Sequence, residues 1–286
     1  APDYPHTAEE PDDAGIVRIP SWRVPFDPED RLLVWPRLMG WAAQFEPGSF
    51  DVIHVQTPFT AHYAGVRLAR SIGAPLLETY HTYFEHYLHH YVPALPATLT
   101  KSFARRLTLS QCNATDHVIS PSPQMADALR TYGVSAPITI LPTGLPPSAF
   151  VKGDRLRFRA LHNIPNERPV ALFVGRIAHE KNIDFLLRML VDLRKREPNV
   201  LMLVAGEGPA ERHIKALVHS LGLDANVQML GNMDRGQTLR DCYRAADVFV
   251  FASRTETQGL VLLEAMAQGT PVVSTAVMGT CLLYTS

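Results

Sequence analysis

The segment Ser253-Arg-Thr-Glu-Thr-Gln-Gly-Leu-Val-Leu-Leu-Glu-Ala-Met-Ala-Gln-Gly-Thr-Pro-Val-Val-Ser274 joins one strand to a helix and then to a second strand. The apolar run Ala246–Ala252 precedes it and predicts a buried strand, and residues 259–268 are apolar at helical spacing. The turn between strand and helix therefore lies at the carboxyl end of a strand, where α/β proteins bind ligands. We expect the rest of the chain to be arranged around this turn.

The start of this predicted helix is suited to binding an anion. The backbone amides of Gln258, Gly259 and Leu260 have no partner within the helix, so they can hold a phosphate or diphosphate. Glu256 precedes the helix, and Glu264 lies about 7–8 Å further along its axis at 1.5 Å per residue. The two carboxylates can then reach hydroxyls on either side of the phosphates, as in a sugar nucleotide. The alternative is two ordinary glutamates on a solvated surface.

Composition is that of a globular protein. The 286 residues are 46% hydrophobic and 19% charged, which is enough for two domains with sizeable cores. The formal net charge of -1 gives no support to nucleic-acid binding. The 3 cysteines have no metal-binding or disulfide spacing, and no apolar stretch approaches 18 residues. We expect a cytoplasmic protein, and we expect the chain to be a piece of a longer one.

Strands and helices alternate in both halves of the chain. Strands are expected at 51–56, 75–79, 117–120 and 138–141, and then at 170–174, 200–205, 227–230 and 248–252. This alternation predicts two doubly wound α/β halves with parallel sheets, joined near residues 142–150. Before them, residues 22–28 are expected to form a loop and residues 31–45 an amphipathic helix disturbed by Pro36.

Two loops of the second half carry further candidate residues. In Gly175-Arg176-Ile-Ala-His-Glu180-Lys181-Asn182, the arginine and the lysine can face one anion, or they can form a solvated charge cluster at a helix start. Gly206-Glu-Gly208-Pro begins like a dinucleotide fingerprint, but Glu211 replaces its third glycine and argues against a dehydrogenase.

Histidines are concentrated in the first half. His81 follows the strand at 75–79, and His86, His89 and His90 come soon after it. This density suggests a metal site, yet no carboxylate completes a motif such as His-Glu-x-x-His. The last three are therefore interpreted as surface or interface residues.

The Glu-x7-Glu spacing of Glu256 and Glu264, with its flanks and the Gly-Arg…Glu-Lys of residues 175–181, resembles the signature of the retaining GT-B glycosyltransferases of family 4. The resemblance covers the chain from about Asp51 to Thr275. It implies an α/β GT-B fold with two Rossmann-like domains facing a cleft. Residues 1–147 would form an incomplete acceptor-side domain and residues 148–286 an incomplete nucleotide-sugar domain.

This resemblance also implies the roles of the candidate residues. Arg176, Lys181 and the amides of Gln258, Gly259 and Leu260 would bind the diphosphate of an NDP-hexose, with UDP-glucose as the expected donor. Glu264 would bind the ribose, and Glu256 and His81 the transferred hexose. Gly175, Gly206 and Gly208 would shape the nucleotide pocket. No strand is followed by Asp-x-Asp, so no metal and no other cofactor is expected.

The acceptor is predicted from weaker similarities. Thr255-Glu-Thr-Gln-Gly259 and the region from His81 to Pro93 resemble the members of family 4 that glucosylate diacylglycerol. Lys101, Arg105 and Arg106, beside Tyr87, Tyr91 and Phe103, could contact anionic lipid at the inner face of the membrane, or could simply be solvated. A soluble sugar or phosphatidylinositol as acceptor, and a nucleotide-sugar-binding remnant without activity, remain alternatives. No protein partner is implied.

Overall fold

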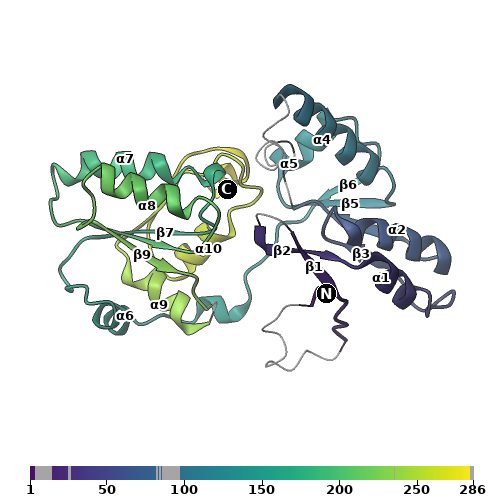
Figure 1. Cartoon of the computed structure of the whole chain (residues 1–286), viewed down its shortest axis with the longest axis horizontal. Helices are drawn as coiled ribbons and strands as arrows, with labels where there is room; N and C mark the ends of the chain where they lie inside the picture. The colour runs from purple at the N-terminus through teal and green to yellow at the C-terminus, as the bar shows by residue number, and fades with distance from the viewer. Residues whose placement is uncertain are drawn as a thin grey trace. The chain divides into compact units, whose positions relative to one another are not determined.

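The computed structural model describes residues 1–3, 15–24, 27–81, 83, 85, 97–234 and 236–283. Its contacts divide the chain into a first unit, Ala1–Pro142, and a second unit, Thr143–Ser286. Figure 1 labels the helices and strands of both units. Within the described residues, no helix combines the length and the apolar composition that spanning a bilayer requires.

The first unit contains a parallel four-stranded sheet with the strand order β3-β4-β5-β6. Its strands are β3 (Ile53–Val55), β4 (Leu76–Thr79), β5 (His117–Ser120) and β6 (Ile138–Ile140). Its helices are α1 (Trp35–Ala42), α2 (Thr60–Ile72), α4 (Ala97–Cys112) and α5 (Pro123–Thr131). Gly73 ends α2 in the left-handed conformation, and the Ser122 hydroxyl caps α5 by accepting from the Met125 amide at 3.3 Å. The predicted α/β alternation is confirmed here.

The amino-terminal part of this unit differs from the prediction. The described residues of the expected loop at 22–28, and the first part of the expected helix at 31–45, belong to an antiparallel strand pair of β1 (Ser21–Val24) and β2 (Asp27–Leu33), here called the hairpin. Helix α1 begins only at Trp35, because Pro36 can occupy the first turn of a helix but not its interior. Leu33, expected on a helix, instead packs from the hairpin against Ile19 and Leu38.

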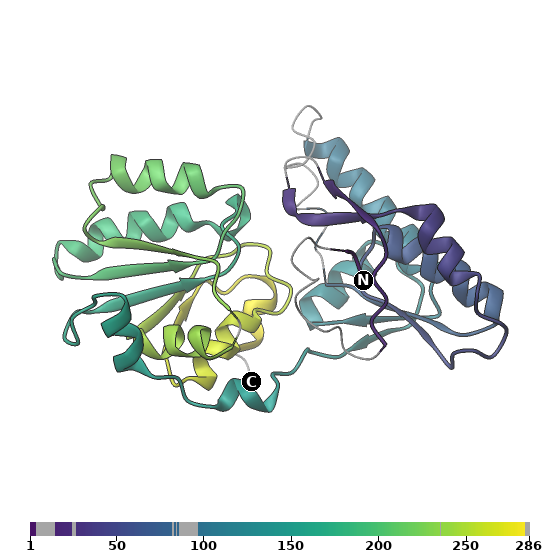
Figure 2. The ribbon, with the colours of Figure 1, turned by 60° about the horizontal axis from the view of Figure 1, so that its bottom comes forward.

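The second unit is a Rossmann-like domain around a parallel five-stranded sheet with the order β11-β10-β7-β8-β9. Its strands are β7 (Val170–Val174), β8 (Leu201–Ala205), β9 (Val227–Gly231), β10 (Val248–Phe251) and β11 (Val272–Ser274). Its helices are α6 (Arg155–Leu161), α7 (Ile183–Arg194), α8 (Glu211–Ser220), α9 (Gln237–Ala245) and α10 (Leu260–Ala267), with short 3-10 turns η1 (Pro147–Phe150), η2 (His179–Lys181) and η3 (Met278–Leu283). Figures 1 and 2 show α7 and α8 on one face of the sheet and α9 and α10 on the other.

The core of the second unit forms because both faces of this sheet are covered. Every residue of β7 and of β8 is buried, as expected for central parallel strands that read as continuous apolar runs. The strand order reverses between β7 and β10, since β8 follows β7 on one side and β10 pairs with β7 on the other. Such a switch point is where open α/β sheets bind ligands at the carboxyl ends of the strands.

A buried arginine secures the start of the second unit. Arg159 of α6 is 0% exposed, and its Nη2 donates to the Asp247 carboxylate at 3.1 Å. The rest of its guanidinium donates to the backbone oxygens of Ala245, Pro165, Asn166 and Arg168. The guanidinium therefore joins α6 to the loop that follows it and to the approach to β10.

We expect Arg159→Met to lower the free energy of unfolding by about 3–5 kcal/mol, because it leaves buried carbonyl oxygens and Asp247 without their donor. Urea unfolding followed by circular dichroism measures this. Arg188→Met, on the exposed face of α7, is the matched control and should change stability by less than about 0.5 kcal/mol. Equal effects of the two substitutions would contradict the structural role of Arg159.

Candidate functional site

Two loops meet at the carboxyl edge of the second unit's sheet. The β7 loop (residues 175–182) follows β7, and the β10 loop (residues 252–259) follows β10, its neighbour in the sheet. The Arg254 amide donates to the Glu180 oxygen at 3.3 Å, and the Asn182 side chain donates to the Ala252 oxygen at 3.4 Å. The parallel strand pairing thus brings together loops that are about 75 residues apart in the sequence.

An ion pair links these loops. Lys181, the last residue of η2, places Nζ 2.8 Å from Oε2 of Glu256, and the two side chains are only 14% and 18% exposed. The ammonium also lies 5.9 Å from the centre of the Phe251 ring, which is a favourable cation–π distance. The predicted diphosphate cation and the predicted hexose-binding carboxylate are therefore in direct contact and neutralise each other.

The predicted glycines let the β7 loop and the loop after β8 pack backbone against backbone. A Cβ atom on Gly206 would lie 2.0 Å from the Gly175 oxygen, and one on Gly208 would lie 2.5 Å from the Ile177 oxygen. The Ile177 amide donates to the Glu207 oxygen at 2.8 Å, which extends the pairing of β7 and β8 beyond the strands. No side chain fits at Gly206 or Gly208, so the β7 loop can lie directly on the loop after β8. Arg176 continues from Gly175 and is half-buried.

The predicted phosphate amides lie where the β10 loop enters α10. Gly259 precedes the helix with φ of 81°, a left-handed conformation that glycine adopts at little cost. Leu260 is the first helical residue. The Gln258 side chain is buried and hydrogen-bonds to the backbone of Thr143. The side chain of Gln258 is thus engaged with the backbone, and the prediction for this residue concerns its backbone amide alone.

Glu264 is oriented by a residue that the sequence patterns did not identify. It lies on α10, half-buried, and its Oε2 accepts a hydrogen bond of 2.7 Å from the Tyr243 hydroxyl. Tyr243 is 1% exposed and belongs to α9. In the sequence it is one apolar position of a predicted helix, and no motif marks it.

Gly279 is a second residue that the sequence patterns missed. Its amide donates to the Glu256 oxygen at 2.8 Å, and a Cβ atom there would lie 2.2 Å from the Thr257 oxygen. The segment after β11 therefore covers the β10 loop closely. A glycine shortly after a strand was the only signal for this contact.

His81 belongs to the first unit, after β4, so the sheet edge just described does not include it. Its Nε2 lies 3.3 Å from Oε1 of Gln56. Burial, and then the neighbouring His54, lower the pKa of the His81 imidazole below its ordinary value. Its ring is therefore neutral near pH 7. His86, His89 and His90 lie outside the described residues, and the parts that are described contain no metal-suited group of three or more His, Cys, Asp or Glu.

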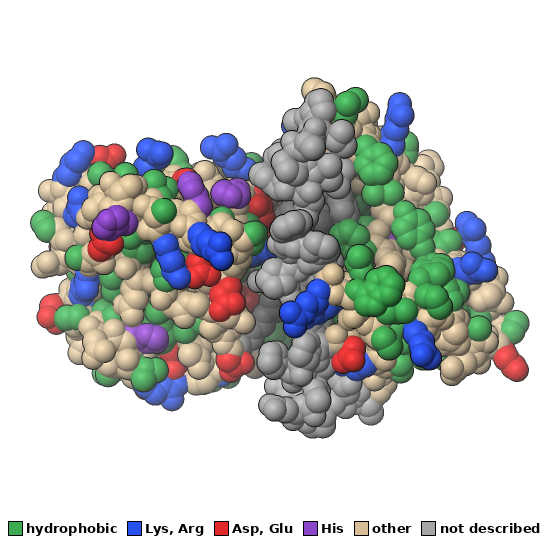
Figure 3. Space-filling model, viewed as in Figure 1, with side chains coloured by type: hydrophobic (Ala, Val, Ile, Leu, Met, Phe, Trp, Pro, Cys, Tyr) green, Lys and Arg blue, Asp and Glu red, His purple; other side chains and the backbone are tan. Residues whose placement is uncertain are grey.

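The proposed basic face of α4 is modified by one ion pair. Arg105 donates twice to the carboxylate of Glu85, at 2.7 and 3.0 Å, so this charge is already compensated. Arg106 is exposed and Lys101 is half-buried, while Tyr87 and Tyr91 lie outside the described residues. Figure 3 shows hydrophobic side chains gathered on one face of the first unit, and its exposed large apolar residues include Trp22, Phe59, Leu99 and Phe103.

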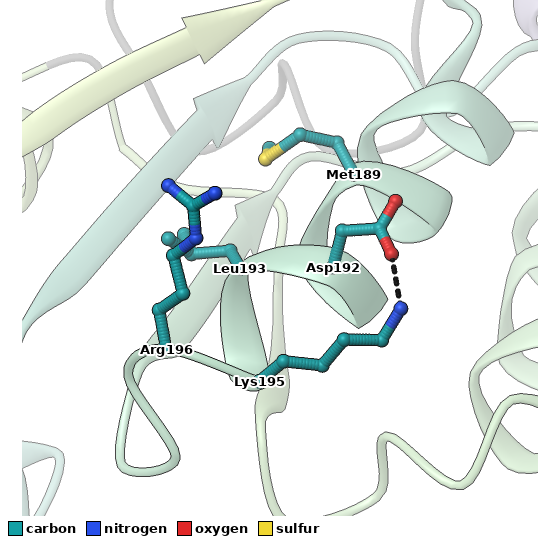
Figure 4. A pocket seen from close by; sticks show the side chains of 5 residues that line it. All are labelled: Met189, Asp192, Leu193, Lys195 and Arg196. Carbon is teal, nitrogen blue, oxygen red and sulfur yellow. Dashed lines mark hydrogen bonds and ion pairs between the residues drawn. The ribbon is translucent and has the colours of Figure 1, made fainter.

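A surface depression over the second half of α7 is unrelated to these residues. It is lined by Met189, Asp192, Leu193, Lys195 and Arg196 (Figure 4). Asp192 and Lys195 pair with each other at 2.6 Å. Because α7 starts at the β7 loop and runs back along the sheet, its end lies away from the carboxyl edge.

Family models match nearly the whole chain. Residues 1–149 match the model for Glycosyltransferase Family 4, and residues 154–284 match the model for Glycosyl transferases group 1. The chain belongs to glycosyltransferase family 4. The first match begins at residue 1, so the similarity extends further toward the amino terminus than the motifs from Asp51 onward indicated.

Known relatives agree with this family membership. The chain is 33% identical over 272 residues to the alpha-monoglucosyldiacylglycerol synthase of Streptococcus pneumoniae, covering 92% of this family 4 chain and 60% of that enzyme. Sucrose-phosphate synthase from Thermosynechococcus elongatus aligns with a TM-score of 0.71 at 26% identity, over 87% of this chain and 61% of that one. Anabaena HepE, solved in complex with UDP and glucose, aligns with a TM-score of 0.69 at 20% identity, over 93% of this chain and 69% of that one. The predicted GT-B fold is confirmed.

We expect Tyr243→Phe to weaken UDP binding about fivefold, since one hydrogen bond to a carboxylate is worth about 1 kcal/mol or more. Calorimetric titration measures the dissociation constant, and the phenyl ring keeps the packing of Tyr243 against Phe249. With 2′,3′-dideoxy-UDP the variant and the parent protein should bind alike. An equal loss with the dideoxy nucleotide would show that Tyr243 does not act through the ribose site.

Proposed function

We propose that this chain is part of a retaining glycosyltransferase that transfers a hexose from UDP-glucose to diacylglycerol or a closely related lipid. The observation that carries the proposal is the Lys181–Glu256 ion pair, which lies at the strand switch point. Glu264 lies nearby in the sequence, on the helix α10 that follows Glu256. A cation, a start of a helix and two carboxylates along one edge match the diphosphate, hexose and ribose of a sugar nucleotide.

The donor would exchange the partners of the ion pair. The arriving diphosphate takes Lys181, and Glu256 is released to accept hydrogen bonds from hexose hydroxyls. Arg176 and the amides of Gln258, Gly259 and Leu260 complete the anion site. These fixed positive groups stabilise the negative charge that develops on the leaving UDP as the glycosidic bond breaks. Glu264, held by Tyr243, binds the ribose hydroxyls.

The transfer itself needs no protein nucleophile. The acceptor oxygen attacks the anomeric carbon from the face that UDP leaves, the bond to the phosphate oxygen breaks, and the acceptor proton passes to a donor phosphate oxygen. Neutral His81 would donate or accept a hydrogen bond at the hexose. The chain's own residues account for this sequence with no metal ion, which is part of the proposal.

The acceptor proposal rests on two observations. The Streptococcus pneumoniae relative is named as a synthase of monoglucosyldiacylglycerol. The first unit also exposes large apolar side chains, such as Trp22 at 69% and Phe103 at 59%, together with the cation of Arg106. Exposed apolar and cationic side chains are the two components of peripheral contact with an anionic membrane.

The test uses the complete protein with UDP-glucose and diacylglycerol in mixed micelles. We expect an α-glucosylated lipid, and no comparable product with GDP-glucose or with a soluble hexose acceptor. Glucosylation of phosphatidylinositol or of a free sugar in place of diacylglycerol would replace the proposed acceptor. A folded protein that binds UDP-glucose without transferring it to any of these acceptors would favour a binding module.

Substitutions in the ion pair should separate binding from chemistry. Glu256→Gln is expected to reduce transfer at least about 100-fold with a smaller loss of UDP affinity, because the amide keeps the shape but loses the charge-assisted bonds to the hexose. Lys181→Ala should weaken UDP about tenfold or more, the value of one hydrogen bond to a charged group. Radiolabelled transfer and calorimetry measure the two quantities.

Lys195→Ala is the matched control for Lys181→Ala. Its ammonium also pairs with a carboxylate, Asp192 at 2.6 Å, but is 70% exposed and lies at the far end of α7. It should leave UDP affinity within about twofold of the parent protein, as expected for an exposed ion pair. If both lysine variants lost the same affinity, Lys181 would have no place in the proposed site.

A further inference from the structure

Two buried glutamines stand at the two ends of α10. Gln258 lies just before the helix and is 7% exposed; Gln268 caps its carboxyl end and is 3% exposed. Both side chains bind backbone groups of the entry segment (residues 143–153), with which the second unit begins. A segment that the sequence suggested to be a linker is therefore held along α10.

The contact of Gln258 is reciprocal. The Thr143 amide donates to its Oε1 at 2.8 Å, and its Nε2 donates to the Thr143 oxygen at 2.6 Å. The side-chain amide thus satisfies both backbone groups of one residue, as a neighbouring β-strand would. Thr143 directly follows Pro142, the last residue of the first unit.

Gln268 makes a contact of the same chemistry. Its Oε1 accepts from the Gly153 amide at 2.8 Å, and its Nε2 donates to the oxygens of Ala149 and Val151 at 2.6 and 3.0 Å. This glutamine is at the end of α10 that is remote from the β10 loop. Both glutamines are thus buried and bind backbone groups of the entry segment, but they bind different residues and lie at opposite ends of the helix.

The β10 loop requires an anchor of this kind. Gly259 makes the loop intrinsically variable, because glycine populates both signs of φ. An anion site made of backbone amides binds well only if these amides are already oriented. The Gln258 side chain fixes the residue immediately before Gly259. The Gly279 amide binds the backbone oxygen of Glu256, two residues earlier in the same loop.

We propose that the Gln258 side chain is a positioning residue for the donor. By binding Thr143 it fixes the peptide groups at the start of α10 toward the diphosphate, and it couples donor binding to the point where the chain enters the second unit. This inference rests on the proposed function and assigns to the side chain a role separate from that of the Gln258 backbone amide.

The first test compares Gln258→Met with Gln268→Met in the complete protein, since methionine keeps the length of glutamine and removes its hydrogen bonds. Both variants should lower the melting temperature. Only Gln258→Met should raise the dissociation constant of UDP, by about tenfold, and the KM for UDP-glucose with it, while kcat changes less. Equal changes of UDP affinity in both variants, or none in either, would overturn the proposal.

A second variant covers the case in which Gln258→Met fails to fold. In Gln258→Glu, one oxygen of the ionised carboxylate still accepts from the Thr143 amide. The other carboxylate oxygen has no proton to donate to the Thr143 oxygen, so that hydrogen bond is lost. The protonated carboxyl can again donate to that oxygen. The ratio of variant to parent UDP dissociation constants should therefore fall as the pH is lowered from 8 through the carboxyl pKa. A ratio independent of pH would contradict the positioning role.

Hydrogen exchange measures the coupling directly, because the Thr143 amide hydrogen is bound to Gln258. UDP should slow exchange of the peptide containing Thr143 in the parent protein and leave it unchanged in Gln258→Met. If UDP did not slow exchange in the parent protein, the proposed coupling would be wrong.

If the parent protein transfers glucose and Gln258→Met matches it in every measurement, only this inference fails. A parent protein that binds no UDP would overturn the proposed function and this inference together.

Discussion

Direct contact between backbones at the carboxyl edge of the second sheet is the constraint on which the candidate site depends. Gly206 packs on the Gly175 oxygen, Gly208 on Ile177 and Gly279 on Thr257, and none of these three positions has room for a Cβ atom. The β7 loop is therefore packed on the loop after β8, and the β10 loop on the segment after β11, while the pairing of β10 with β7 brings Lys181 to Glu256. A methyl group at Gly206 or Gly279 would displace a whole loop, since backbone atoms cannot move aside as a side chain can.

Two charged groups of the second unit contrast in how far solvent can reach them. The Arg159 guanidinium is fully buried and binds oxygens that belong to the fold itself, so its partners cannot change without unfolding. Lys181 and Glu256 keep 14% and 18% of their side-chain surface exposed, so solvent or an anion can reach them. A partly accessible pair can exchange partners at modest cost, whereas a fully buried one cannot. The two kinds of charged group lie at opposite ends of β10: the contacts of Arg159 precede Val248, and the partly accessible ion pair follows Phe251.

Much of the fold was predictable from local pattern. The run Val170–Val174 is apolar throughout because β7 is covered on both faces, and the spacing of Leu186 and Leu190 matches the buried side of α7. The hairpin was not predictable in this way. Leu32, Leu33 and Trp35 continue a helical spacing, and only the pairing of Trp22 with Leu32 across the hairpin, a tertiary contact, overrides it.

The site was predictable in its residue types and less so in its contacts. The sequence places Lys181 and Glu256 after separate strands, but their contact depends on β10 pairing with β7, which spacing alone does not determine. Tyr243 had no signal at all, because a buried hydroxyl on α9 gains meaning only when Glu264 of α10 is seen opposite it. His81 remains a sequence-based assignment, since it belongs to the first unit.

The hydrogen bonds of Gln258 and Gln268 make the entry segment part of the second unit's structure. The match to Glycosyl transferases group 1 begins at residue 154, after every backbone group that these glutamines bind. A polypeptide started at Asp154 would lack every backbone group that the two side-chain amides bind, and would lose these hydrogen bonds. The contacts of the entry segment thus belong to the second unit from Thr143 onward, eleven residues before the family match begins.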